Sequence, residues 1–417
     1  MITQLRVMHQ ELCVGRLVQN SLGKILFQYE PSWLKGGFNL APASMPFDAL
    51  AHPAARTIFD NLHGVFNDSL PDGWGLLLMD RALKQHKNLD RAQITPLDRL
   101  AYLGRRCMGA LAYEPELLPH HDRLAFELAD IAKESMSVLS GETDQVLESL
   151  RINAGSPGGA RAKATVAFSA DMQVCQSSFI DLPEHFSHWI VKFRDDKALG
   201  GEPIDSGRME MAYAQMARQA GIEMPRTHLI ELSVKHQKEA YFAVQRFDRR
   251  GCQKMHTLSL SGFAYASHRL PSLDYGEAVL PATKKLTKSN TEVERAFRLM
   301  VFNVLAHNKD DHAKNFAYLM DPLNFTWKLS PGFDLTFNHG MSGQHATSIN
   351  GAGNPVFEDI KQVAQRSRIS NWRSIVEEVR EGVASWSKLA RQYDVGASKI
   401  EEISRALKAV DQEACAP

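Results

Sequence analysis

Residues 307–316 read HNKDDHAKNF and follow a run with the apolar spacing of a helix. Asp310 and Asn315 in this stretch form a D-x-x-x-x-N pattern. In kinases this spacing places a base on the hydroxyl that accepts the phosphoryl group, and an amide on Mg²⁺. The pattern therefore predicts Asp310 as a catalytic base and Asn315 as a metal ligand. The same spacing excludes Asp311 as the base.

A second metal ligand is predicted in PGFDLTFN, residues 331–338. Asp334 is an isolated aspartate between apolar residues in this segment. Mg²⁺ prefers a few protein oxygens, with the remaining ligands from water and phosphate, and Asn315 with Asp334 would supply them. The alternative is that the DDH and FD segments are only capping and turn residues.

A metallohydrolase is the rival interpretation of the same segment. Its histidines and aspartates would then gather a metal pair of the kind used in hydrolysis. The side chains concerned are His307, Asp310, Asp311 and His312, with His339 and His345 downstream. This interpretation gives no role to the glycines and the strand lysine that lie upstream.

Those glycines belong to SPGGARAK, residues 156–163, which precede a strand candidate. Gly158 and Gly159 allow the backbone to approach a ligand closely, and exposed N–H groups at such a turn can bind phosphate. Arg161 and Lys163 add positive charge. The alternative is a mobile surface turn.

The strand lysine is Lys192, in the apolar run HWIVKF (188–193). A buried ammonium is costly unless it is paired. A nucleotide phosphate and the carboxylate of Glu210, in the next predicted helix, would pair with it as in protein kinases. Otherwise the lysine head extends to water.

The apolar periodicities predict an α+β fold in three parts. These parts are an N-terminal α/β domain (1–120), a kinase small lobe (121–250) and a mostly helical large lobe (251–417). The strand candidates are short runs within 3–30, then 108–114, 164–169, 188–193, 240–247 and the segments NFAYLM and FTWKLS. The helix candidates are 73–104, 122–151, 207–220 (ended by Gly221), 290–307 and 370–411.

Composition excludes several classes of protein. The 48 basic and 48 acidic residues balance, which argues against binding nucleic acid unaided. The five cysteines are scattered without a CxxC spacing, which favours a reducing compartment over disulfides or structural zinc. No stretch reaches the ~18 apolar residues of a membrane span. We therefore expect a cytoplasmic protein that does not bind membranes.

Taken together, these motifs resemble a known family. SPGGARAK, HWIVKF, FAVQRFDRR, NKDDHAKNF and PGFD, in this order, resemble the HipA toxin kinases, which pair with HipB-like antitoxins in bacteria. VGRLV, FNDSLPDGWG and LDRLAYLGRRCMGALAYEPE are similar to the N-terminal domain of that family. The resemblance covers nearly the whole chain, and FDRR together with DDHAKNF is its specific part.

The resemblance implies a serine/threonine protein kinase that uses ATP and Mg²⁺, and a role for each matching residue. Asp310 would be the catalytic base, His312 and Asn315 would complete its loop, and Asn315 with Asp334 would hold Mg²⁺. Ser156 matches the serine that such kinases autophosphorylate. The residues implied at the nucleotide are Gly158, Gly159, Ala160, Arg161, Ala162, Lys163, Lys192, Glu210, the hinge Gln245, Arg246 and Phe247, and Phe333 beside Asp334.

The resemblance also implies partners. These are a small HipB-like helix-turn-helix antitoxin, DNA only through that antitoxin, and a protein substrate such as an aminoacyl-tRNA synthetase. The sequence departs from the family at Ala162, where many relatives carry proline, and at Gln245, where glutamate is also seen. The alternatives are a kinase-like corepressor without catalysis and a lipid or small-molecule kinase. No basic amphipathic membrane segment favours the latter.

Overall fold

The described part of the computed structural model divides into two compact units. The first is Met1–Ile204 with Ile230–Leu258, and the second is Asp205–Leu229 with Ser259–Pro417. Segment 205–229 therefore groups with the C-terminal part of the chain, although it follows the strands of the first unit in sequence. The described residues are 2–117, 127–140, 143, 150, 153, 158–159, 161–179, 182–194, 205–234, 237–251, 253–271 and 273–414.

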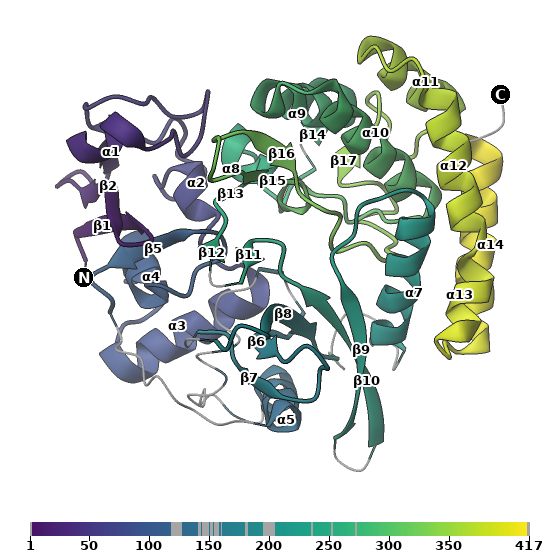
Figure 1. The fold of residues 1–417 in the computed structure, drawn as a ribbon, viewed down its shortest axis with the longest axis horizontal. Helices are drawn as coiled ribbons and strands as arrows, with labels where there is room; N and C mark the ends of the chain where they lie inside the picture. The colour runs from purple at the N-terminus through teal and green to yellow at the C-terminus, as the bar shows by residue number, and fades with distance from the viewer. Residues whose placement is uncertain are drawn as a thin grey trace. The chain divides into compact units, whose positions relative to one another are not determined.

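The described part of the first unit contains two five-stranded sheets, a two-stranded sheet and the helices that pack against them (Figure 1). Its elements are β1 (Gln4–His9), β2 (Leu12–Gln19), β3 (Ile25–Tyr29), α1 (Pro31–Gly36), β4 (His52–Pro53), α2 (Gly64–Asn67), α3 (Gly73–Lys87), α4 (Pro96–Leu103), β5 (Leu111–Glu114), α5 (Leu128–Ser140), β6 (Lys163–Phe168), β7 (Cys175–Ser177), β8 (Ser187–Lys192), β10 (Gln237–Gln245), β11 (Arg249–Arg250) and β12 (Gln253–Lys254). Strands β9 (Thr227–Val234) and β13 (Thr257–Ser259) cross from one unit to the other.

The N-terminal sheet forms where apolar and polar residues alternate. Leu5 and Val7 are buried, whereas Arg6 between them is exposed, as expected for a strand with one face on the core. The strand order is β4-β3-β2-β1-β5, with β1 antiparallel to both of its neighbours. This confirms the antiparallel sheet predicted for residues 3–30 and the strand predicted within 108–114.

Helix α4 shows how local sequence sets an element boundary in this unit. The Thr95 hydroxyl accepts a hydrogen bond from the Asp98 amide, and the Asp98 carboxylate accepts one from the Thr95 amide, which is a capping box. Pro96 occupies the first turn, where its missing N–H costs nothing. The helix predicted over 73–104 is therefore two helices, because α3 ends at a left-handed Asn88 and a new cap begins at Thr95.

The second sheet of the first unit has the strand order β7-β6-β8-β10-β9. Its core packs Val166 of β6 and Val191 of β8 against Ile131 and Ala132 of α5, all of which are fully buried. Each such aliphatic side chain stabilises the fold by roughly 1.5–3 kcal/mol. The predicted strands 164–169, 188–193 and 240–247 are confirmed. The predicted helix 122–151 is confirmed only for α5, and much of its remainder lies outside the described residues.

The second unit is mostly helical. Its elements are α7 (Ser206–Gln219), α8 (Leu260–Ala264), β14 (Leu273–Asp274), a π-helix (Tyr275–Val279, η1), α9 (Leu280–Thr287), α10 (Asn290–Leu305), a 3₁₀-helix (Ala313–Asn315, η2), β15 (Ala317–Met320), β16 (Trp327–Leu329), β17 (Thr347–Ser348), α11 (Phe357–Arg366), α12 (Trp372–Ala384), α13 (Trp386–Gln392) and α14 (Ala397–Ala414). In Figure 1 the yellow-green α12 and the yellow α13 lie beside α7, and α14 packs against α13.

Helix α10 is the central helix of this unit. Ser289 caps it by accepting a hydrogen bond from the Glu292 amide, and Val293, Phe297 and Val304 are buried at helical spacing. Helices α9 and α12 pack against α10, and α7 packs against α12 and α13. The predicted helices 290–307 and 207–220 and the strand pair in 315–330 are confirmed. Packing onto α12 and α13 explains why α7, predicted inside part 121–250, groups with the second unit.

The three-part division at residues 120 and 250 stays a prediction. No helix within the described ranges combines the length and the apolarity that a bilayer crossing needs.

Candidate functional site

The segment with the D-x-x-x-x-N pattern forms a tight loop directly after α10. Asp310 is exposed to solvent, and Asn315 ends the short 3₁₀-helix that follows it. The Asn315 side-chain amide donates a hydrogen bond of 2.7 Å to the Asp310 carbonyl. The five-residue spacing is therefore explained locally, because one 3₁₀ turn brings the asparagine back to the aspartate. An exposed carboxylate held on a fixed loop is suited to accept a proton from a substrate hydroxyl.

The start of this loop is fixed against the segment around residue 338. His307 has a left-handed backbone, and its ring stacks on Phe337 at 4.9 Å between centroids. The Asn338 amide donates to the His307 carbonyl at 3.0 Å, and Asn308 and Asn338 form a parallel bridge. Burial lowers the pKa of His307, and the nearby Lys309 adds to the effect. This histidine is therefore a neutral packing group at pH 7.

Asp334 lies four residues before Asn338 and in the same unit as Asn315. Both side chains are half-buried. Asp334 has a φ of 56°, a left-handed conformation that aspartate adopts more readily than branched residues do. One amide oxygen and one carboxylate form a donor set of the kind that Mg²⁺ accepts, so the residues present fit the predicted metal. Their roles as ligands, and that of Phe333 beside Asp334 at the nucleotide, stay predictions.

The metallohydrolase interpretation is not supported. Asp311, one of its four proposed ligands, is fully buried, and two backbone amides, Tyr275 and His345 already donate to its carboxylate. Within the described ranges no group of three or more histidine, cysteine, aspartate or glutamate side chains is placed to hold a metal. A metal pair of that kind is therefore not built by this segment.

The glycine segment lies in the first unit and is held by the N-terminal part of the chain. Gly159 has a φ of 99°, which favours glycine, and its amide donates to the Asp72 carboxylate. The Gly159 carbonyl accepts a hydrogen bond of 3.0 Å from the Trp74 amide. The predicted Ser156 and Ala160 lie outside the described residues. Gly158 and Gly159 therefore form a turn whose amide already binds one anionic group, the carboxylate of Asp72.

Two lysines flank this turn on neighbouring strands. Lys163 of β6 and Lys192 of β8 face each other in register and are 5% and 8% exposed. The Lys163 ammonium donates to the Gly158 carbonyl at 2.5 Å, and the Lys192 ammonium lies 5.7 Å from the centre of the Phe242 ring. Like charges directly opposite on a sheet repel each other. An anion such as a nucleotide phosphate would relieve that repulsion, as predicted for this segment.

Two other predicted residues of the segment have structural roles. The Arg161 guanidinium donates to the Phe193 carbonyl at 2.7 Å, which ties the turn to the end of β8. Ala162 is fully buried among the residues of the sheet core. Whether either also contacts a nucleotide stays a prediction.

The predicted hinge, residues 245–247, leads into a buried ionic network. The Arg246 guanidinium binds Asp248 through two hydrogen bonds of 2.9 and 2.7 Å, and its amide donates to the His188 carbonyl. Arg249 binds the same carboxylate and the carbonyls of segment 107–109. Burial raises the pKa of Asp248, but the two guanidiniums outweigh it and lower the pKa well below the usual range.

This network gives the Arg246 side chain a structural role that the sequence did not indicate. Its guanidinium is 1% exposed and is committed to Asp248, so it is a structural anchor of the first unit. The hinge role of Gln245, Arg246 and Phe247 stays a prediction. The sequence motif FDRR marks this anchor, and the sequence interpretation did not assign Asp248 or Arg249 a role.

Glu210 and His312 complete the predicted set. Glu210, in α7 of the second unit, is 3% exposed, and Lys192 is buried in the first unit. The ion pair predicted between them stays a prediction. His312 lies edge-on to His268 at 5.8 Å, and its Nδ1 is buried without a hydrogen-bond partner among the described residues. The role of His312 in completing the loop stays a prediction.

The fold is that of an α+β protein of the kinase-like class. Residues 5–114 match the family model described as the HipA N-terminal domain, and residues 155–387 match the one described as the HipA-like C-terminal domain. The chain belongs to the HipA family.

The structure is also similar to solved structures. HipA of the Shewanella oneidensis MR-1 toxin–antitoxin system, solved with HipB and its operator DNA, matches with a TM-score of 0.70 and 15% identity, over 99% of this chain and 97% of that chain. The Helicobacter pylori proinflammatory kinase CtkA matches with a TM-score of 0.32 and 14% identity, over 52% of this chain and 92% of that chain. No curated protein matches the chain.

Proposed function

We propose that this protein is a serine/threonine kinase that transfers the γ-phosphoryl group of ATP to a protein hydroxyl. The observation that carries the proposal is the loop in which exposed Asp310 is fixed by the Asn315 amide. Asp310 accepts the proton of the substrate hydroxyl while the hydroxyl oxygen attacks the γ-phosphorus of ATP. The bond between that phosphorus and the β–γ bridging oxygen breaks, and ADP is released.

The residues of the first unit support nucleotide binding. Buried Lys163 and Lys192 supply positive charge for phosphates beside the turn of Gly158 and Gly159. Asn315 and Asp334 would hold Mg²⁺, which neutralises charge on the phosphates when bound. Positioning and electrostatics of this kind supply most of the catalysis in phosphoryl transfer, since little covalent chemistry falls to the protein.

The partners and the compartment are proposed on family grounds. A HipB-like helix-turn-helix protein would neutralise the kinase and carry it to operator DNA, because balanced charge gives this chain no basic excess of its own. The Shewanella HipA solved with HipB and operator DNA supports this partner. The substrate would be a cytoplasmic protein, with an aminoacyl-tRNA synthetase as the first candidate.

Ser156 is proposed as a site of autophosphorylation. It precedes the turn of Gly158 and Gly159, and a phosphate adds about −1.5 to −2 charges. That charge would repel the phosphates of ATP or attract Arg161 and Lys163, and either effect would weaken nucleotide binding. Mass spectrometry after incubation with Mg-ATP and calorimetry of the modified protein test this. Undiminished ATP affinity of the phosphorylated form would overturn it.

The direct test of the kinase proposal uses the purified chain with labelled Mg-ATP and a generic protein acceptor. We expect Asp310→Ala to bind nucleotide normally and to lose transfer by about 10²–10⁴-fold, the usual contribution of a general base. Asp334→Ala should instead weaken the binding of Mg-ATP. Transfer at the wild-type rate by Asp310→Ala would contradict the assignment. A wild type that binds ATP but never transfers phosphate would favour the corepressor.

A further inference from the structure

Asp311, next to the proposed base, has the opposite environment. Asp310 is exposed, whereas Asp311 is fully buried. A buried carboxylate is costly unless donors surround it, and here they do. Its Oδ1 accepts hydrogen bonds of 2.9 and 3.2 Å from the amides of Ala346 and Thr347. Of the two adjacent aspartates, Asp310 is therefore exposed to solvent and Asp311 is hydrogen-bonded in the core.

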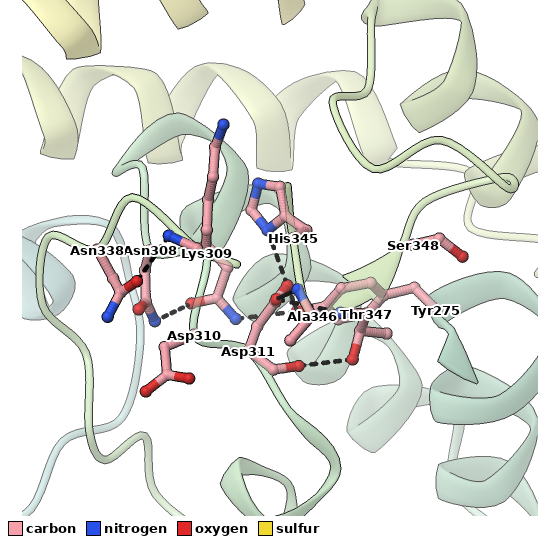
Figure 2. A network of polar contacts seen from close by, with 12 residues as sticks. Tyr275, Asn308, Lys309, Asp310, Asp311, Asn338, His345, Ala346, Thr347 and Ser348 are labelled. Carbon is pink, nitrogen blue, oxygen red and sulfur yellow. Dashed lines mark hydrogen bonds and ion pairs between the residues drawn. The ribbon is translucent and has the colours of Figure 1, made fainter. Parts of the chain in front are cut away.

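The other carboxylate oxygen of Asp311 binds two side chains. The Tyr275 hydroxyl donates to Oδ2 at 2.9 Å, and the His345 Nδ1 lies 2.9 Å from the same atom. Tyr275 opens the π-helix, a rare element that often occurs at functional sites. Figure 2 shows His345 and the backbone of 346–347 converging on Asp311 while Asp310 points away from them.

Hydrogen bonds through α10 also connect Tyr275 to the loop that contains Asp310. The Asn303 side-chain amide donates to the Tyr275 hydroxyl, and the Asn308 side-chain amide donates to the Asn303 oxygen, each at 2.9 Å. All three side chains are buried. Tyr275 therefore accepts one hydrogen bond and donates the next, so the direction of donation is consistent from Asn308 to Asp311.

The backbone on both sides of Asp310 is fixed to the same segment. The Lys309 carbonyl accepts from the Ala346 amide at 3.1 Å, and the Asp311 carbonyl accepts from the Thr347 hydroxyl at 2.5 Å. The Lys309 ammonium also donates to the Gly343 carbonyl at 2.7 Å. Segment 343–347 therefore holds the residues before and after the exposed Asp310.

We propose that Asp311 is a positioning residue for Asp310. Through Asp311, catalysis depends on segment 343–347 being well ordered. The proposal rests on the proposed kinase function. Asp311 acts through its hydrogen bonds and does not touch the reacting atoms. When Asp311 loses its donors, the loop shifts, and a misplacement of about 1 Å at the reacting groups can cost about 10²-fold in rate.

The test compares Asp311→Asn and Asp311→Ala with the wild type in transfer from Mg-ATP to a generic acceptor or to the chain itself. Asparagine keeps one side-chain oxygen that can accept from the backbone amides of Ala346 and Thr347, whereas alanine removes every side-chain acceptor. We expect kcat to fall in the order wild type, Asn, Ala, with Asn reduced by about 10-fold and Ala by about 10²-fold. The KM for ATP should stay unchanged.

The matched control is Asp98→Asn. Asp98 is also fully buried and hydrogen-bonded, but it caps α4 in the first unit. We expect it to lower the melting temperature without changing kcat below the transition. If Asp311→Asn behaves like Asp98→Asn, with full kcat, Asp311 is only structural and the proposal is overturned.

Hydrogen exchange separates this proposal from the kinase proposal. We expect faster amide exchange across residues 338–349 in both Asp311 variants and unchanged exchange in Asp310→Asn, which alters only the exposed acid. If the wild type is active but amide exchange in Asp311→Ala is unchanged, the positioning role of Asp311 is refuted and the kinase proposal stands. An inactive wild type with faster exchange in that variant refutes the kinase function, and with it any catalytic role for Asp311.

Discussion

At the residue scale, the glycine turn gives a sharp prediction. A Cβ at Gly159 would lie 2.3 Å from the Lys163 ammonium nitrogen, and its φ of 99° is unfavourable for other residues. Gly159→Ala should therefore displace Lys163 and weaken ATP binding at least 10-fold, as measured by calorimetry. Gly23 is the matched control, because it has a φ of 76° and open space around it. Equal ATP affinities for the two variants would contradict the role of this turn.

The sequence indicated single residues that could carry chemistry, but it did not indicate the contacts that hold them in place. Asp310 and Asn315 were predicted because their spacing is set by one local turn. Asp72 was not, because it meets Gly159 only in the folded first unit, 87 positions away in sequence. The spacing excluded Asp311 as the base, and its burial shows that loss of activity in Asp311→Ala would not identify it as the base either.

At the element scale, the FDRR motif joins the end of β10 to segment 107–109. Asp248, 2% exposed, forms ion pairs with both Arg246 and Arg249 and accepts a hydrogen bond of 2.7 Å from the Gly109 amide. Removal of one partner from a buried ionic group leaves uncompensated charge and typically costs about 3–5 kcal/mol. We predict that Asp248→Ala lowers the free energy of unfolding by that amount in urea titrations.

The control for Asp248 is Arg250→Ala. Arg250 belongs to the same motif but is exposed, so its replacement should change the free energy of unfolding by less than about 0.5 kcal/mol. Stability losses of similar size in both variants would mean that the buried network is not the anchor. Sequence could identify FDRR as a family marker, but only the long-range contact with 107–109 shows what it does.

The paired lysines of β6 and β8 give a second prediction at this scale. Lys163 and Lys192 are opposite each other in register, so each should contribute to holding the same anion. Lys163→Met and Lys192→Met should each abolish the increase in melting temperature that Mg-ATP causes, since a ligand stabilises only the state that binds it. Retention of the full ATP-induced shift in both variants would refute the phosphate site.

At the scale of the whole molecule, buried histidines predict sensitivity to acid. Burial lowers the pKa of His63 and of His256 to about 4, from 6.5. Between pH 6.5 and pH 4 these histidines bind protons in the unfolded chain but not in the folded chain. Their contribution to the free energy of unfolding is therefore complete above pH 6.5 and is lost as the pH falls toward 4. Each histidine contributes about 1.4 kcal/mol per pH unit in this window.

Urea titrations between pH 7.5 and pH 5 measure that slope. His256→Gln should flatten it, because glutamine keeps a donor for the Leu40 carbonyl, which lies 2.8 Å from His256 Nε2, and cannot titrate. A slope that is the same in wild type and variant would show that His256 does not control it.

The division of the chain into units was the least predictable feature. Most strands and helices were predicted because their periodicity is local. The grouping of α7 with the second unit depends on its packing against α12 and α13, which follow more than 150 positions later in sequence. Residues far apart in sequence decide such groupings, so apolar spacing within α7 alone could not reveal them.

Phosphoproteomics after induction tests the central claim most directly. Cells that express the wild type are compared with cells that express Asp310→Ala at an equal level. We predict phosphoserine or phosphothreonine on one or a few proteins in the wild-type cells, and none of these modifications with the variant, because the exposed Asp310 is the base. Identical sets of phosphorylated sites in the two samples would contradict the account.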